Sequence, residues 1–185
     1  MLSSAQFRTE WQANGDRLVA ASAKALRPLG LPPDDARFLV EAGLPADAAP
    51  FLWFEALRAD PLLLVRDQWQ LPSAFPAYWS IGSNGSGDPI GLLSTGHVYV
   101  LNHDDGFSPL LLNVSVRHLA EALLAYREAV HLTLAQGDDD AFLEGRIPHA
   151  VQVWFRERLR DIDPLASSTA SLWTSELEGW ANGAA

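Results

Sequence analysis

Residues 78–113 read YWSIGSNGSGDPIGLLSTGHVYVLNHDDGFSPLLLN, and the fold class can be inferred from them. It contains four short apolar runs, separated by clusters of Gly, Ser, Asn, Asp and Pro. Short runs with turn residues between them are typical of neighbouring antiparallel strands. No long helical pattern lies between the runs, so the stretch predicts a meander and disfavours a doubly wound nucleotide-binding fold.

Two apolar runs upstream of the meander extend this pattern. Residues 51–54 (FLWF) and residues 62–65 (LLLV) are short and lie between Pro and charged residues. Runs of about 4–8 apolar residues with such boundaries are consistent with buried strands. We therefore expect a short strand at each of these positions.

Helical patterns flank the strands on both sides. Residues 3–29 are rich in Ala and Leu and predict helix with a break near Asn14–Gly15. Pro32 and Pro33, followed by two Asp, mark the start of another helix. This helix is expected to end at Gly43, because Gly favours the left-handed conformation that follows many helices.

Downstream of the strands, residues 115–135 place apolar side chains at three- and four-residue steps and predict a long amphipathic helix. Asn113 and Ser115 are both candidates for its N-cap. Further helices are expected up to Asp163–Pro164 and over residues 172–180. The order of helices, strand meander and helices predicts an α+β fold, a single domain in which helices flank a mostly antiparallel sheet.

The chain of 185 residues carries 23 Asp and Glu against 13 Lys and Arg, which gives a formal net charge of −10. No nucleic-acid partner is expected, because phosphate backbones are bound through Lys and Arg. A basic protein partner would be attracted by this charge. The alternative is an acidic surface that serves only solubility, and the charge taken alone favours that alternative.

Cysteine is absent from the sequence, which excludes disulfides, thiolate metal sites and Cys nucleophiles. No basic segment followed by an apolar region marks a signal peptide, and no apolar stretch reaches the ~18 residues of a membrane span. We therefore expect a soluble, cytoplasmic protein with no membrane partner.

Three segments carry residue types that catalysis or metal binding would use. The Gly-rich residues 82–88 suit phosphate binding or a tight hairpin, and the strands on both sides favour the hairpin. His103–Asp104–Asp105 suits a cation site or a polar hairpin loop, and side-chain alternation along a strand favours the loop. Asp138–Asp140 is interpreted as a solvated helix start, and Trp173 and Trp180 as core residues. Neither an HExxH nor a GxSxG motif is present, so we expect no enzyme, no catalytic residue, no metal site and no cofactor.

Four segments together point to a known family. Residues 37–45 read RFLVEAGLP, residues 78–101 contain the strand and Gly-rich turn quoted above, residues 112–119 read LNVSVRHL, and residues 161–166 read DIDPLA. In this order and spacing they resemble the SUKH superfamily, particularly its fourth subfamily of immunity proteins. The resemblance covers roughly residues 36–180. It divides the chain into an N-terminal helical segment, residues 1–30, and a SUKH-like α+β domain, residues 31–182.

The resemblance implies a protein that binds and neutralises a cognate bacterial toxin by stoichiometric inhibition. Such toxins are often nucleases or deaminases, and a basic toxin would fit the negative charge of this chain. The resemblance transfers no catalytic residue, and it leaves the oligomeric state open. We expect the toxin to contact acidic loop residues: Asp88, Asp104, Asp105, Asp138, Asp139 and Asp140.

The alternative function is a small-ligand-binding or regulatory adaptor domain without a toxin partner. In that hypothesis the Gly-rich loop and His103 would line a pocket. Stabilisation of the protein by nucleotides or divalent metals would favour this alternative.

Overall fold

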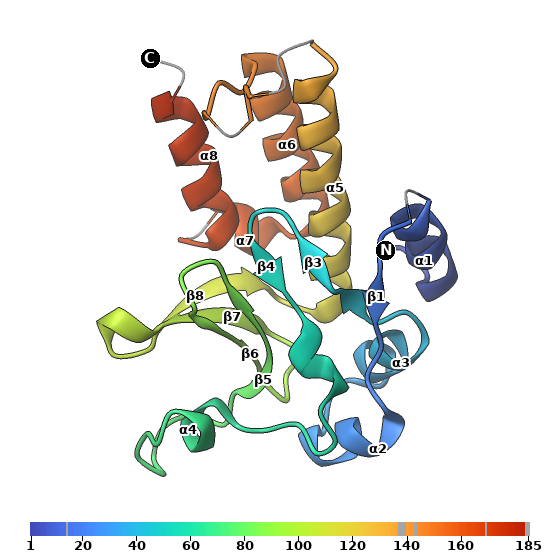
Figure 1. The fold of residues 1–185 in the computed structure, drawn as a ribbon, viewed down its shortest axis with the longest axis vertical. Helices are drawn as coiled ribbons and strands as arrows, with labels where there is room; N and C mark the ends of the chain where they lie inside the picture. The colour runs from blue at the N-terminus through green and yellow to red at the C-terminus, as the bar shows by residue number, and fades with distance from the viewer. Residues whose placement is uncertain (14, 137–139, 143, 169, 184–185) are drawn as a thin grey trace.

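A six-stranded antiparallel sheet forms the centre of the computed structural model, which describes residues 1–13, 15–136, 140–142, 144–168 and 170–183 (Figure 1). Each strand pairs with its neighbours in sequence. The strands are β3 (Asp47–Ala48), β4 (Leu52–Trp53), β5 (Trp79–Asn84), β6 (Pro89–Leu92), β7 (Val98–Asn102) and β8 (Ser108–Asn113). The meander expected from residues 78–113 and the strand expected at residues 51–54 are therefore confirmed.

The N-terminal part of the long helix α5 (Val116–Leu134), which follows β8, packs against one face of the sheet (Figure 1). At its start the Ser115 hydroxyl accepts a hydrogen bond from the backbone N–H of His118, so Ser115 is the N-cap. The helices α6 (His149–Ile162), α7 (Pro164–Ser168) and α8 (Leu172–Gly183) follow, and α6 packs along α5. Helices before and after an antiparallel sheet confirm the α+β class. Within the described residues, none of the helices has the length and apolarity needed to cross a lipid bilayer.

The N-terminal residues form shorter elements than the sequence predicted. α1 (Ser4–Gln12), α2 (Ala23–Leu26) and the 3₁₀ turn η1 (Arg27–Leu29) are helical, but β1 (Leu18–Val19) lies between them and pairs with β2 (Leu44–Pro45). The helix expected over residues 3–29 is therefore wrong for the middle of that range, because strand pairing satisfies the backbone there.

The first helix packs on the same core as the rest of the chain. The fully buried ring of Phe7 in α1 lies 5.4 Å from the ring of Phe38 in α3 (Pro33–Glu41). Both rings belong to the main hydrophobic cluster, which also contains side chains from the sheet and from α5. One core therefore includes residues on both sides of position 30.

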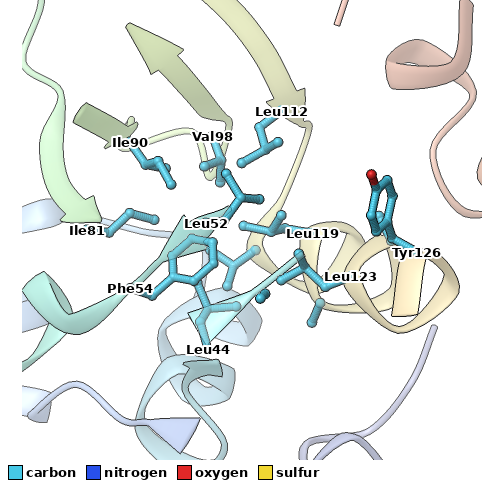
Figure 2. Close-up of a cluster of buried hydrophobic side chains, with 14 of the residues drawn as sticks. Leu44, Leu52, Phe54, Ile81, Ile90, Val98, Leu112, Leu119, Leu123 and Tyr126 are labelled. Atoms are coloured by element: carbon cyan, nitrogen blue, oxygen red, sulfur yellow. The ribbon is translucent and has the colours of Figure 1, made fainter. Parts of the chain in front are cut away.

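Hydrophobic clusters lie on both faces of the sheet. Along β7, Val98 and Val100 belong to the main core under α5, whereas Leu101 belongs to a smaller cluster on the opposite side. Figure 2 shows Leu119 and Leu123 of α5 among the strand side chains that form the main core. We call the side of the sheet that faces away from α5 the outer face.

Residues 62–65 do not form the strand expected from their composition. Only Leu64 makes a strand-like bridge, with Trp79, and Val65 begins the short helix α4 (Val65–Gln68). Leu62 is buried in the main core and Val65 in the cluster on the outer face. The run is apolar because this connection supplies side chains to both clusters.

Gly43 follows the last residues of α3 with left-handed backbone (φ +75°), as the sequence predicted for the helix end. A Cβ at Gly43 would lie 2.0 Å from the carbonyl oxygen of Val19 in β1. We expect Gly43→Ala to lower the free energy of unfolding by about 3 kcal/mol, because the clash adds to ~1–2 kcal/mol of left-handed strain.

Gly30→Ala is the matched control for this prediction. Gly30 is also left-handed (φ +64°), but no atom lies within 4 Å of an added Cβ. Its substitution should therefore cost only the strain, about 1–2 kcal/mol. Urea unfolding of both variants measures the difference, and equal losses would contradict the importance of the contact between Gly43 and β1.

Candidate functional site

The outer face of the sheet carries a layer of aromatic side chains. The ring of Tyr78 lies 5.7 Å from Tyr99 and 5.9 Å from Phe75. Phe75 lies 6.1 Å from Phe107, and Phe107 lies 5.1 Å from Trp69. The segment that contains α4 therefore packs on the sheet through a continuous series of ring contacts, which ends at the partly exposed Trp69.

Beside this layer lies a groove of about 260 Å³, lined by β4, α4 and the β5–β6 hairpin. Trp53 and Trp69 line it and remain 37% and 42% exposed. Ser80 and Gly82 of β5 also line it, and a Cβ at Gly82 would lie 2.0 Å from the Trp53 carbonyl oxygen. We call this feature the tryptophan groove. Trp side chains that are left exposed beside a groove are characteristic of protein-binding surfaces.

Exposed apolar side chains gather in the part of the chain that forms this groove. Of the eight large hydrophobic residues that are exposed in the described structure, four lie between positions 51 and 69: Phe51, Trp53, Leu63 and Trp69. Two of these four, Trp53 and Trp69, line the groove, which favours the tryptophan groove as a binding surface.

The carboxylate of Asp88 ties the two hairpin tips next to the groove together. Asp88 Oδ1 accepts a hydrogen bond from the backbone N–H of His103 at 2.9 Å and lies 2.6 Å from His103 Nδ1. Its Oδ2 accepts a hydrogen bond from Asn84 Nδ2 at 2.9 Å. The ring of His103 in turn lies 5.4 Å from that of Trp69, so this network supports one wall of the tryptophan groove.

These hydrogen bonds also set the charge state of Asp88. Burial alone would raise the pKa of its carboxyl group. The hydrogen bonds from His103 and Asn84, together with the attraction of the His103 ring, outweigh burial and hold the pKa below its ordinary value. The carboxylate is therefore the favoured form at neutral pH.

The acidic residues expected to contact a partner do not form one patch. Asp88 is only 8% exposed and its carboxylate is occupied within the chain. Asp104 and Asp105 are exposed at the β7–β8 tip, and the Asp104 side chain is 88% exposed. Asp140 is exposed in the α5–α6 connection, while Asp138 and Asp139 lie outside the described residues. Figure 1 places the α5–α6 connection at the top of the view and the β7–β8 tip at the left, so the two regions are separate.

Both loops singled out for possible chemistry connect neighbouring strands. In the β5–β6 hairpin, the left-handed Gly87 donates its backbone N–H to the Asn84 carbonyl, which confirms the tight hairpin. The 3₁₀ turn η3 (His103–Asp105) joins β7 to β8, which confirms the polar hairpin loop. In the part of the chain that the structure describes, no three His, Asp or Glu side chains are grouped so as to hold a metal ion.

The Asp88 network gives a prediction for stability against pH. Asp88→Asn should lower the free energy of unfolding by about 2 kcal/mol at pH 7, because hydrogen bonds to a charged acceptor contribute about 1.5–3 kcal/mol. A carboxylate with a lowered pKa stabilises the fold fully above its unfolded-state pKa of about 4, and this stabilisation is lost as the pH falls through the folded-state pKa. The difference between wild type and Asp88→Asn should therefore shrink in acid.

Urea unfolding at pH 7 and at about pH 3 measures this difference. Asp67→Asn is the control, because the Asp67 side chain is 68% exposed. Its effect should be small at both pH values. If the stability difference between wild type and Asp88→Asn were the same at both pH values, the proposed role of the Asp88 charge would be contradicted.

The geometry defines an α+β protein in which α5 packs on one face of an antiparallel meander, while α4 and an aromatic groove lie on the other. A sequence model described as SUKH-4 immunity protein matches residues 4–179. The chain therefore belongs to the SUKH-4 immunity protein family, as its resemblance to the fourth SUKH subfamily predicted. The match begins at residue 4, upstream of the region on which the resemblance was based. No curated protein and no solved structure matches the chain significantly.

Trp53 and Trp69 were not among the candidates derived from the sequence. Trp53 lies in the apolar run at residues 51–54, which was interpreted only as a buried strand. A signal was present at Trp69, because the polar residues Gln68 and Gln70 flank it. An isolated Trp between polar residues is a reasonable candidate for a surface position.

Proposed function

We propose that this protein binds a bacterial toxin and neutralises it by stoichiometric inhibition in the cytoplasm, without catalysing a reaction. The observation that carries the proposal is the pair of partly exposed Trp side chains beside a groove, next to an acidic loop, in a chain of an immunity protein family. Docking of the toxin on this surface would block its active site or its substrate groove.

The tryptophan groove supplies the apolar centre of the proposed interface. Interface energy is concentrated in a few aromatic or Arg side chains that become fully desolvated, and Trp is the most enriched of them. Trp53 and Trp69 are held by the fold yet partly open to solvent, so a toxin side chain inserted between them would bury both.

The exposed Asp104 and Asp105 supply the charged rim of the proposed interface. They directly follow His103, whose ring contacts Trp69, so this rim lies beside the tryptophan groove. A basic toxin, such as a nuclease or deaminase, would be attracted by these two carboxylates and by the net charge of −10. Rim charges mainly accelerate association, whereas apolar anchors slow dissociation. Asp88 holds the loops in position in this proposal. Asp138–Asp140 would be contacted only by a toxin large enough to reach the α5–α6 connection.

Co-expression with the toxin encoded beside this gene tests the proposal. The expected result is rescue of growth together with co-purification of the two proteins in a fixed ratio. Folded and abundant protein that neither protects the cell nor co-purifies would refute the proposal for that pair.

Association kinetics with the purified toxin test the steering charges. The double variant Asp104→Asn/Asp105→Asn should slow association about tenfold at low salt and change dissociation little. Raising the salt should remove most of the difference from wild type, because exposed charges are screened. Asp161→Asn, an exposed Asp at the end of α6, is the matched control. Association that did not depend on salt would exclude steering by the acidic tip.

A further inference from the structure

A second cavity lies on the opposite side of the β3–β4 hairpin tip, between that tip and the helices α5 and α8. Its volume is about 430 Å³, within the range of small-ligand sites of about 300–1,000 Å³. The hairpin contributes Phe51, which is 66% exposed and lies at the mouth. The tryptophan groove does not share Phe51 or any other residue with this cavity.

Aromatic rings that contact one another form the wall of the cavity. Tyr126 of α5 lies 5.4 Å from Trp180 of α8 and 5.7 Å from Phe142, measured between ring centroids. Phe142 lies 5.9 Å from Trp180. Tyr126 and Trp180 are further fixed by contacts with the buried Phe155, at 5.5 Å and 5.3 Å. The fold itself therefore brings these rings together, in the absence of any ligand.

The charged groups that line this cavity are acidic. Glu176 of α8 and Asp47 of β3 line it, and its described lining includes no Lys, Arg or His. Tyr126 donates its hydroxyl hydrogen bond to Glu176 Oε2. Burial raises the pKa of Glu176, and the hydrogen bond from Tyr126 opposes that rise only in part. A positive charge beside Glu176 would therefore favour the ionised form of this half-buried carboxyl group.

We propose that this cavity binds a monovalent organic cation, an ammonium or guanidinium group carried on a short apolar stem. The exposed Phe51 and the partly exposed Phe142, with Tyr126 and Trp180 packed behind them, offer aromatic surface to a cation, and Glu176 supplies the compensating charge. The apolar stem would lie against Val130 and Pro50, which also line the cavity. An anion is disfavoured by the two carboxylates, and a neutral apolar molecule would gain nothing from them.

Such a cation has two possible sources. It is either a free small molecule or the Lys or Arg side chain of a protein that approaches the hairpin tip. Both present the same group to Glu176, and probes of each kind distinguish them. Choline represents the free quaternary ammonium, and the N-acetyl amides of lysine and arginine represent the side chains.

Titration of the full-length protein with these probes, followed by NMR at the indole N–H of Trp180, tests the inference. At least one cation should bind saturably, and 3,3-dimethylbutan-1-ol, which has the shape of choline without its charge, should not. Glu176→Gln should weaken binding of that cation at least tenfold. Gln keeps the size of Glu and still accepts the Tyr126 hydrogen bond, so the fold is expected to survive. Glu178→Gln removes an exposed charge from the same helix and should leave binding unchanged.

The pH dependence provides an independent readout. The titratable groups that line the cavity are Asp47 from β3, Tyr126 from α5 and Glu176 from α8. Affinity for the cation should rise with pH as Glu176 ionises, and this rise should be absent in Glu176→Gln. Tighter binding of the amino-acid amides than of choline would assign the site to a basic side chain, and the reverse would assign it to a free cation.

Three outcomes would overturn the inference: no saturable binding of any cation, saturable binding of the neutral analogue as tight as that of the best cation, or unchanged cation binding by Glu176→Gln. The test uses this protein alone. Its failure therefore leaves the proposed neutralisation of a toxin untouched, and failure of neutralisation leaves the cation site untouched.

Discussion

Replacing Asp163 by Ala should lower the free energy of unfolding by about 5 kcal/mol, because it removes the acceptor at the centre of a fully buried polar network. Asp163 lies between α6 and α7 and has no exposed surface. Its Oδ2 accepts hydrogen bonds from Asn113 Nδ2 and from the backbone N–H of Val114, both at 2.9 Å. Its Oδ1 accepts a third, from the backbone N–H of Ala166 at 3.1 Å.

The network continues from Asn113 into the last helix. The Asn113 side-chain oxygen accepts a hydrogen bond from Trp173 Nε1 at 3.0 Å. Asp163, Asn113 and Trp173 are all fully buried and connect β8, the α6–α7 junction and α8. The C-terminal helices are therefore held to the sheet by specific hydrogen bonds in addition to apolar packing.

The size of the expected loss follows from the donors left behind. Asp163→Ala leaves three N–H groups without their acceptor, two buried and that of Val114 partly buried, and each unsatisfied buried donor costs about 1–3 kcal/mol. Domains are stable by about 5–15 kcal/mol, so the variant should be close to unfolding at 37 °C. Asp163→Asn keeps the side-chain volume but turns an NH₂ group toward other donors. Its free energy of unfolding should fall by less than that of the Ala variant.

Urea unfolding followed by circular dichroism measures these losses. Asp161→Ala, two residues away and exposed on α6, is the control and should change stability by less than about 0.5 kcal/mol. A loss of less than about 2 kcal/mol in Asp163→Ala would contradict the network, because it would mean that other groups or water satisfy the donors.

This network also shows where prediction from the sequence ends. Asn113 was identified only as a possible cap of α5, a local role that Ser115 takes instead. Its partner Asp163 is 50 residues away, and a cap or a periodicity is a property of neighbours in sequence. The meander was predictable for the opposite reason, because each strand pairs with the next one across a short turn.

The acidic loops show a second limit of prediction from the sequence, which is the burial of individual loop residues. Asp88 and Asp104 are both Asp residues in hairpin connections, and the sequence treated them alike. The fold buries Asp88 against the backbone of His103 and leaves Asp104 in solvent. The interpretation of Trp173 and Trp180 as core residues is confirmed, since an amphipathic helix carries its own burial pattern. For Trp69, the flanking Gln residues indicate a surface position, but its place beside a groove follows from the packing of α4 on the outer face.

Trp69→Ala should weaken binding of the toxin about 100-fold, which corresponds to about 3 kcal/mol. The truncation removes one wall of the tryptophan groove, and the proposed interface loses the largest apolar surface that docking would bury. Most of the change should appear as faster dissociation, because apolar anchors act after the encounter. Surface plasmon resonance with the purified toxin measures both rate constants.

The fold should survive this substitution, because Trp69 is 42% exposed and outside the main core. Circular dichroism of the variant provides that check. Leu165→Ala is the matched control, since Leu165 is an apolar residue of similar exposure, 46%, on α7. It should leave affinity unchanged within about twofold. If the toxin bound Trp69→Ala normally but lost affinity for Leu165→Ala, the docking surface would lie on the C-terminal helices, and the proposed neutralisation would still stand. This pair of variants therefore tests where the toxin binds separately from whether it binds.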